Sequence, residues 1–442
     1  MSVLKRITTS SMFTPLLVLA LILLFNVIVQ PGFLSVEVRE GVMRGGLINT
    51  LNRSVPVMLL AIGMTLVIST GGVDLSVGSV LAIGSAVAIT LIRGDDASPT
   101  ENTAMALGLV VIITLLVGVV CGLWNGVLVA KIGMPPIIAT LIFMVAGRGL
   151  TQNITGERSV TTGHLPFSVI ANGSTSVSIV PYALWYVMIA FSVLLMLYKS
   201  RLIHKILGKE EKLAAPPKTT KTDSKESSGF PGIIIKILSG IGIFIKNNII
   251  ALCILAFGIF GLVAYYFLYV PGIPNQIWIA LVVFLIFWFF TRRTALGLFI
   301  ESVGANRSAA RLSGIKSSTI LIVIYAVSGL CAAIAGILSA SNVRVIEPMN
   351  TGRDMELDAI LAVVLGGTNM KGGKFNLGGS CVGAIILMAL TQTMTFYGVN
   401  VESTMWIKAV VIVIIILIQS PTTRKFLASL FKKSSKREVT VK

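Results

Sequence analysis

The sequence predicts an all-α, polytopic integral membrane protein of about ten transmembrane helices. Two observations carry this prediction, the composition and the lengths of the apolar runs. The 442 residues are 55% hydrophobic and 12% charged, with a mean hydropathy of +0.91, which is far too apolar for a water-soluble domain. Apolar runs recur along the chain at about 17–25 residues, the length that an α-helix needs to cross a bilayer.

The expected spans follow one another with few long interruptions. A shorter run at 358–370 is expected to form half a span or a re-entrant segment. The first run is interpreted as a retained anchor, because no small-residue cleavage site follows it. The full-length runs are residues 13–30, 54–70, 73–92, 104–130, 134–152, 181–198, 249–270, 275–290, 319–340, 376–396 and 403–420.

Basic residues are distributed unevenly between alternate loops. One side holds 27 Lys and Arg against 6 Asp and Glu, and the other holds 7 against 10. By the positive-inside rule the first side is cytoplasmic, so both termini are expected inside a bacterial cytoplasmic membrane. The net charge of +18 therefore indicates topology and contact with anionic lipid, and not nucleic-acid binding. The basic side comprises 1–12, Lys131, 199–248, 291–318, 371–375 and 421–442.

The chain is expected to contain two transmembrane halves, 1–198 and 249–420. Residues 199–248 are rich in Lys, Ser, Thr and Pro, which is typical of a flexible cytoplasmic linker. Residues 421–442 form a basic cytoplasmic tail. Two similar halves are typical of a duplicated transporter, although the internal similarity is faint. Its best match pairs two glycine-rich breaks, Gly71, Gly72 and Gly78 with Gly366, Gly367 and Gly372.

The sequence contains no motif that indicates an enzyme. The nearest approach to a phosphate-binding loop has Thr368 where the first glycine belongs and Phe375 after Lys374. The four cysteines stand singly in apolar runs, and there are only two histidines, so no metal site or bound cofactor is expected. Three classes remain: a channel, an ion-coupled secondary transporter, and the membrane subunit of a transporter driven by a separate ATPase.

Four charged residues lie in or beside apolar runs: Asp74, Arg148, Asp358 and Lys408. Ionisable groups at membrane depth indicate function by default. The alternative for Arg148 and Lys408 is that they extend to the membrane interface from nearby span ends. The glycine-rich breaks are hinge and pathway candidates, because irregular backbone in a membrane must be buried or line a watery cavity.

Asp74 lies in "STGGVDLSVGS" and has two compatible interpretations. As a helix N-cap, its carboxylate would accept the free N–H of Ser76 or Val77. As a pathway residue, it would meet substrate where a broken helix points into the route. An N-cap at a break also makes a hinge.

The loop 291–318 contains a second candidate site. Asn306 is expected to cap a short helix, "RSAARL", that ends at Gly314. Such a basic helix, held between two spans, is suited to fit a groove on a partner that supplies force. The alternative is an ordinary helix at the membrane interface.

Five motifs then resemble one known family: "GGVDLSVGSVLAIGSAVA", "GLWNGVLVAKIGMPPIIATL", "GRGL", "ESVGANRSAARLSGI" and "ELDAILAVVLGGTNMKGG". They are similar to the permease subunits of bacterial monosaccharide ABC importers of the ribose, xylose and galactose type. The stretch "MPPIIATLIFMVAGRGLTQ" looks most like the galactofuranose-type branch. The resemblance covers about residues 50–200 and 285–420.

The resemblance implies a fold similar to the vitamin B12-type importer permease. It also implies a second permease copy or paralogue, a pair of ATP-binding subunits that hold ATP and Mg²⁺, and an extracytoplasmic sugar-binding protein. The family's coupling loop matches Ala309, Ala310 and Gly314. Ser308 stands where the family has a glutamate, and Arg311 is the expected substitute for an ionic contact.

The function expected is translocation of a monosaccharide received from that binding protein. Low-affinity polar groups would line the route, although each can equally be a packing residue between helices. The alternatives are an ion-coupled secondary sugar transporter and a channel. The lining candidates are Asp74, Asn125, Gln152, Asn342, Asp358 and Thr368.

Overall fold

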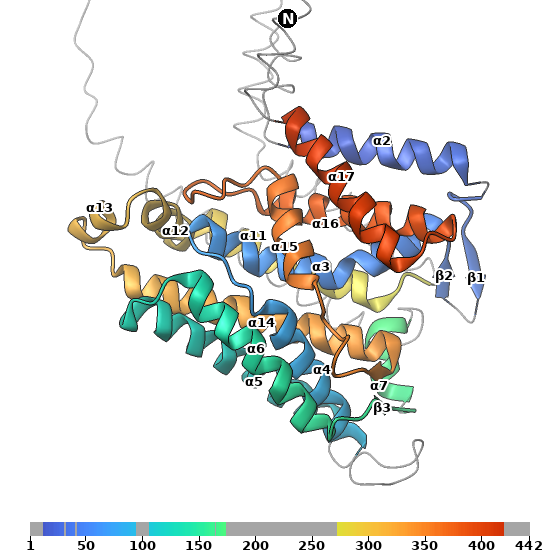
Figure 1. Ribbon diagram of the computed structural model, residues 1–442, viewed down its shortest axis with the longest axis horizontal. Helices are drawn as coiled ribbons and strands as arrows, with labels where there is room; N and C mark the ends of the chain where they lie inside the picture. The colour runs from blue at the N-terminus through green and yellow to red at the C-terminus, as the bar shows by residue number, and fades with distance from the viewer. Residues whose placement is uncertain are drawn as a thin grey trace, which may run out of the picture. The chain divides into compact units, whose positions relative to one another are not determined.

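Long apolar helices dominate the computed structural model (Figure 1). It describes residues 12–30, 32–39, 42–93, 106–163, 165–173 and 272–419. The helices and strands named below all belong to one compact unit, to which residues on both sides of 175–272 contribute. Several predictions lie outside the described residues: the spans at 181–198 and 249–270, the linker 199–248 and the tail 421–442.

Six helices of the described part are long and apolar enough to cross a membrane, by length and composition. They are α3 (Gly46–Ser69), α5 (Leu107–Val127) with its π-helical continuation η1 (Leu128–Ile132), α6 (Pro136–Thr155), α11 (Asn275–Arg293), α14 (Ser317–Val343) and α16 (Leu377–Phe396). Three more apolar helices, α2 (Phe13–Val29), α4 (Val77–Arg93) and α17 (Val401–Gln419), match further predicted spans. The polytopic all-α class is therefore confirmed.

Shorter elements connect the spans. Helix α15 (Met355–Leu365) is the expected half-length segment, whereas α3 begins eight residues before its apolar run. A turn precedes α6, with Gly133 in the left-handed region and Pro136 as the first residue of the helix. The other short elements are α7 (Leu165–Asn172), α12 (Ala295–Ala305), α13 (Arg307–Leu312), β1 (Glu37–Arg39), β2 (Val42–Arg44), β3 (Val160–Thr161) and β4 (Val345–Ile346).

Helix α14 forms the centre of the unit and packs against α3, α4 and α5. Small residues make this close packing possible. A Cβ on Gly118 of α5 would lie 2.6 Å from the carbonyl oxygen of Gly329 on α14. The strands β3 and β4 also pair across the two halves, Val160 with Ile346. The halves expected from the sequence are thus interlocked through α14.

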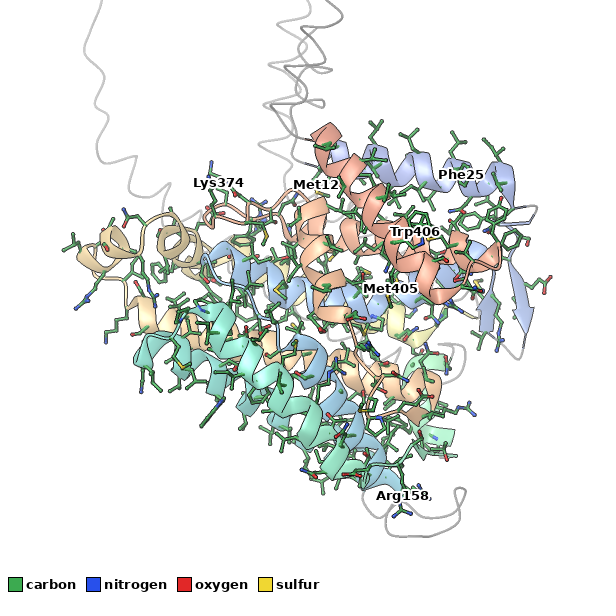
Figure 2. The ribbon with its side chains drawn as sticks, in the orientation of Figure 1. Met12, Phe25, Arg158, Lys374, Met405 and Trp406 are labelled. Atoms are coloured by element: carbon green, nitrogen blue, oxygen red, sulfur yellow. The ribbon has the colours of Figure 1, made fainter. Side chains whose placement is uncertain are left out.

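The unit has two ends that are named here by their elements. At the α12–α13 end, the loop between α15 and α16 meets the end of α3, because the Gly373 N–H donates to the Ser69 carbonyl over 2.8 Å. At the β3–β4 end lie the ends of α6 and α14, and α7. Arg158 and Lys374 mark opposite ends in Figure 2.

Large apolar side chains cover the outer faces of several helices. Ile112, Leu116 and Val120 on α5 are each more than half exposed. Figure 2 labels two further examples, Phe25 on α2 and Trp406 on α17. Exposed apolar surface on helices of membrane-spanning length is what contact with lipid requires.

Candidate functional site

Asp74 lies in the non-helical break between α3 and α4 and is only 2% exposed. Its Oδ1 accepts hydrogen bonds from the Ser76 backbone N–H at 3.0 Å and from Ser76 Oγ at 2.5 Å. Its Oδ2 accepts from Ser328 Oγ on α14 at 2.8 Å. The predicted capping bond to Ser76 is therefore confirmed, and the carboxylate additionally ties the start of α4 to α14.

The same cluster includes Asn125, which the sequence proposed separately as a pathway residue. Asn125 Nδ2 donates to Ser76 Oγ at 2.8 Å, and the Asn125 side chain is fully buried. Sequence reasoning missed Ser328 and Tyr325. The Tyr325 hydroxyl is also buried, and a Cβ on Gly72 would lie 2.9 Å from it. Among the described residues no Lys or Arg pairs with Asp74, so neutral donors hold its carboxylate.

Arg148 of α6 is held by groups of the segment before α15 and of α15 itself. Its two terminal nitrogens donate to the carbonyls of Thr351 at 2.6 Å and Gly352 at 2.9 Å. Its Nη2 lies 4.0 Å from Oε2 of Glu356 on α15. Any side chain at Gly78 would overlap the Glu356 carboxylate, so the start of α4 fits directly against this pair. Sequence reasoning did not single out Glu356, although an intramembrane Arg calls for a nearby acid.

Lys408 and Asp358 form an ion pair with each other. Lys408 Nζ on α17 lies 3.0 Å and 3.2 Å from the two carboxylate oxygens of Asp358 on α15. The two side chains are 15% and 20% exposed. This pairing favours a structural role for both residues, because it joins α15 to α17 and neutralises both charges.

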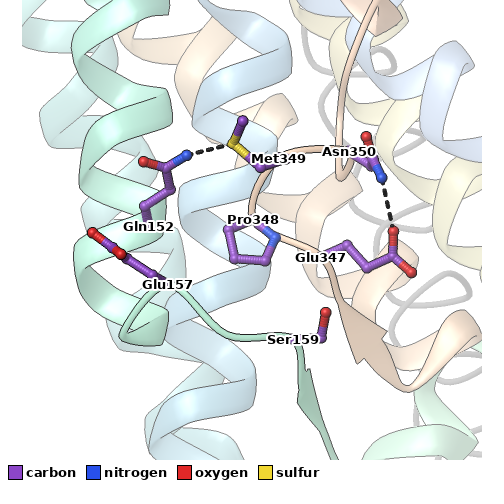
Figure 3. Close-up of a pocket in the computed structure, with 7 residues that line it drawn as sticks. All are labelled: Gln152, Glu157, Ser159, Glu347, Pro348, Met349 and Asn350. Atoms are coloured by element: carbon purple, nitrogen blue, oxygen red, sulfur yellow. Dashed lines mark hydrogen bonds between the residues drawn. The ribbon is translucent and has the colours of Figure 1, made fainter.

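The other three pathway candidates lie in different places. Gln152 lines an open cavity at the β3–β4 end (Figure 3). Asn342 is near the same end, where its backbone carbonyl accepts a hydrogen bond from Asn172. The Thr368 hydroxyl accepts from the Asn376 N–H and braces the loop before α16. The six candidates therefore do not form one site, and only Asp74 and Asn125 come together.

The two glycine-rich breaks meet at the α12–α13 end. A Cβ on Gly372 would lie 3.0 Å from the Gly71 nitrogen. Gly304, the penultimate residue of α12, completes the contact, because a side chain there would overlap the Ser69 carbonyl and lie 2.6 Å from the Gly373 nitrogen. The turns after α3 and α15 thus share one contact with α12.

Helices α12 and α13 replace the single short helix expected in 291–318. Helix α12 was not foreseen, although Leu296, Ile300 and Val303 recur at helical spacing, and Ile300 and Val303 are buried. The predicted cap is confirmed, since Asn306 Oδ1 accepts from the Ala309 N–H at 2.9 Å.

Helix α13 ends in the way that the sequence predicts. Gly314 has φ +83°, and the N–H groups of Gly314 and Ile315 donate to the carbonyls of Arg311 and Ala310. Ala310 is 4% exposed and packs inward, whereas Leu312 is 90% exposed. Ala309 and Arg311 are exposed too, so these residues and Leu312 present the outward surface of α13.

Apolar helices around a central span, broken helices that begin within the unit, and charged groups at those breaks are typical of polytopic membrane transport proteins. The chain belongs to the family described as "Branched-chain amino acid transport system / permease component", which matches residues 46–419. No solved structure matches the chain, so the similarity to the B12-type fold stays a prediction.

Relatives with assigned transport functions match nearly the whole chain. The galactofuranose transporter permease protein YtfT of Escherichia coli is 34% identical over 92% of this chain and 88% of its own length. The fructose import permease protein FruF of Bifidobacterium longum is 31% identical, over 97% and 93%. The ribose import permease protein RbsC of Escherichia coli is 29% identical, over 91% and 92%.

Proposed function

We propose that this chain is the membrane-spanning permease subunit of an ATP-driven ABC importer that translocates a monosaccharide. Three relatives that match almost end to end are named as sugar permeases, for galactofuranose, fructose and ribose. The sequence contains no phosphate-binding loop, so ATP and Mg²⁺ would bind to separate subunits. The α12–α13 end carries the basic segments 291–318 and 371–375 and would face the cytoplasm. Both termini would lie on that side of a bacterial cytoplasmic membrane.

The single observation that carries the coupling role is the contact of Gly304 with both glycine-rich breaks. Helix α13, which begins two residues after the end of α12, presents Leu312 and Arg311 outward. A force applied to α13 would therefore reach α12, and through Gly304 the turns after α3 and α15. The two turns are far apart in the sequence, but the hydrogen bond from the Gly373 N–H to the Ser69 carbonyl joins them directly, so they can move together.

The segments that meet at this contact also carry buried charged residues. The α3–α4 break contains Asp74, and α15 carries Glu356 and Asp358. A small displacement of the two turns would shift the start of α4 against α14 and against the Arg148–Glu356 pair. Alternating access in this account is a rearrangement at these broken helices, since α14 interlocks the halves of the chain.

The partners follow from the same class of transporter. Two ATP-binding subunits would contact α13, and a second permease copy or paralogue would complete the membrane unit. A sugar-binding protein would deliver substrate at the β3–β4 end. The B12-type arrangement of these parts is part of the proposal.

The test is uptake into proteoliposomes that contain the permease with its ATP-binding subunits and the binding protein. Labelled fructose, ribose and galactose are compared with labelled leucine, because the family description mentions amino acids. The proposal expects sugar uptake that requires ATP and the binding protein. Uptake by the chain alone, driven by a proton or sodium gradient, would show an ion-coupled carrier instead. Non-saturable flux would show a channel, and leucine uptake would overturn the substrate class.

A further inference from the structure

The β3–β4 end contains an open cavity of about 410 Å³ between the end of α6 and the segment after β4. Figure 3 shows side chains of both segments around it, with Gln152 and Glu157 on one side and Glu347 and Asn350 on the other. Two parts of the chain that are far apart in sequence therefore build one polar recess. Its lining residues are Gln152, Glu157, Ser159, Glu347, Pro348, Met349 and Asn350.

Each of the two amide side chains in the cavity donates one hydrogen bond to another lining residue. Gln152 Nε2 donates to the Met349 sulfur, and Asn350 Nδ2 donates to Glu347 Oε2 at 3.0 Å. The amide oxygens and most carboxylate oxygens are left as acceptors. Within the described part of the chain, neither Glu157 nor Glu347 forms an ion pair with a basic side chain. One N–H of each amide and the Ser159 hydroxyl remain as donors, so acceptors outnumber donors in the cavity, and it suits a ligand that mainly donates hydrogen bonds.

The volume of the cavity and the residues that line it restrict the class of ligand further. The volume lies near the lower end for small-molecule sites, which span roughly 300–1,000 Å³. Pro348 and Met349 contribute apolar surface among the polar groups. A monosaccharide matches this lining, because its hydroxyls can donate hydrogen bonds to the acceptor oxygens and its ring has apolar C–H faces. Each carboxylate can accept from two neighbouring hydroxyls at once.

The cavity adjoins the buried charges described above. Gln152 lies four residues after Arg148 on α6, so both lie on one helix face. Asn350 immediately precedes Thr351 and Gly352, whose carbonyls bind Arg148. From Arg148 the polar groups continue to Glu356 and the start of α4. A ligand in the cavity therefore rests on the segments that hold the Arg148–Glu356 pair.

We propose that this cavity, held between α6 and the β4–α15 segment by Gln152, Glu157, Glu347 and Asn350, is a reception site for a neutral monosaccharide. This proposal rests on the proposed function, because the proposed function places the β3–β4 end, and with it the cavity, on the extracytoplasmic side. It adds a defined first binding site on the permease itself. The site is open and binds weakly, so that the sugar can move on from it.

The experiment measures sugar binding to the full chain in nanodiscs, without binding protein or ATP. Saturation-transfer NMR is recorded with fructose, ribose and galactose, and lysine and Ca²⁺ are added as competitors. Wild type is compared with Glu157→Ala and Glu347→Ala. Glu301→Ala, in α12 at the other end, is the matched control. Thermal melting of each variant verifies that it remains folded.

The proposal expects a saturable sugar signal that falls at least fivefold in both cavity variants and is unchanged in Glu301→Ala. An equal signal in all four proteins overturns it. Displacement of the sugar by Ca²⁺ or lysine at lower concentration than the sugar itself also overturns it, because the cavity would then be a cation site. ATP-driven uptake by the wild-type complex is measured in parallel. Uptake with no cavity-dependent binding refutes only the reception site, whereas absence of sugar uptake refutes the proposed function.

Discussion

Ser328 Oγ donates a 2.8 Å hydrogen bond to Asp74 Oδ2, which joins residues 254 positions apart in the sequence. Both side chains are almost completely buried. The bond fixes the beginning of α4 to the middle of α14, the helix around which the unit is packed. The other carboxylate oxygen, Oδ1, accepts from Ser76. Asp74 therefore stabilises the break between α3 and α4 and also joins it to α14.

Asp74→Ala removes an acceptor of three hydrogen bonds, so we expect it to lower the free energy of unfolding by about 2 kcal/mol or more. Asp74→Asn keeps an acceptor for Ser76 and should cost less than about 1 kcal/mol. Thermal unfolding of the detergent-solubilised chain measures the difference. Glu301→Ala is the control, because among the described residues Glu301 forms no ion pair. If both Asp74 variants fold like wild type and lose transport equally, the charge is needed for transport and the capping account is wrong.

Lys408 and Asp358 should show strong energetic coupling, since each neutralises the other between α15 and α17. We expect Lys408→Ala and Asp358→Ala each to lose more than half of the unfolding free energy that the double variant loses. The coupling energy should be about 0.5–3 kcal/mol. A double-mutant cycle on thermal stability measures it. The exposed Arg353–Asp354 pair, at 67% and 48%, should give a coupling near zero. Additive effects at Lys408 and Asp358 would contradict a structural pair.

Gly304→Ala should separate ATP hydrolysis from transport. The added methyl would overlap the Ser69 carbonyl, so α12 must move away from the two glycine-rich breaks. We expect the assembled importer to hydrolyse ATP while sugar uptake falls at least tenfold. The matched control is Gly149→Ala, because nothing lies near the position of its added Cβ. Equal uptake in both variants would remove Gly304 from the coupling path.

The end of α13 depends on Gly314, whose φ of +83° is costly for any residue with a Cβ. No other atom would obstruct a side chain there, so Gly314→Ala should cost about 1–2 kcal/mol through backbone strain alone. Gly314→Asn should cost less, since Asn adopts this conformation more readily. Thermal melting ranks the variants, and equal stability of Ala and Asn would contradict the left-handed cap.

Leu312→Ser tests the outward face of α13 without disturbing the fold. The side chain is 90% exposed, so the melting temperature of the permease alone should stay unchanged. If α13 fits a groove on an ATP-binding subunit, loss of this apolar contact should weaken retention of that subunit several-fold during purification. Ser313→Ala, at the next position, is the control. Unchanged retention would indicate an ordinary interfacial helix.

Local patterns in the sequence predicted much of this structure. Apolar runs located every span in the described part, and the residue types at Asn306 and Gly314 predicted both ends of α13. These features depend on neighbours within one or two helical turns. The Asp74 cap was predictable for the same reason, because Ser76 is two residues away.

Contacts between distant segments were not predictable in the same way. Nothing in the pattern around Asp74 indicates Ser328, and Arg148 reaches Glu356 only after α6 and α15 have packed together. The proposed pathway residues were chosen by type alone, so they fall in several places. Helix α12 was missed because its apolar residues occupy a loop that the charge pattern had made cytoplasmic.

The central claim is that another subunit hydrolyses ATP to drive sugar through this chain. The most direct test is purification of the full-length permease in mild detergent, followed by photolabelling with an azido-ATP analogue. The account predicts labelling of a separate co-purifying subunit, with no label on the permease, and retention of that subunit reduced by Leu312→Ser. A permease that carries the label itself, or one that moves sugar in liposomes with no labelled partner present, would contradict it.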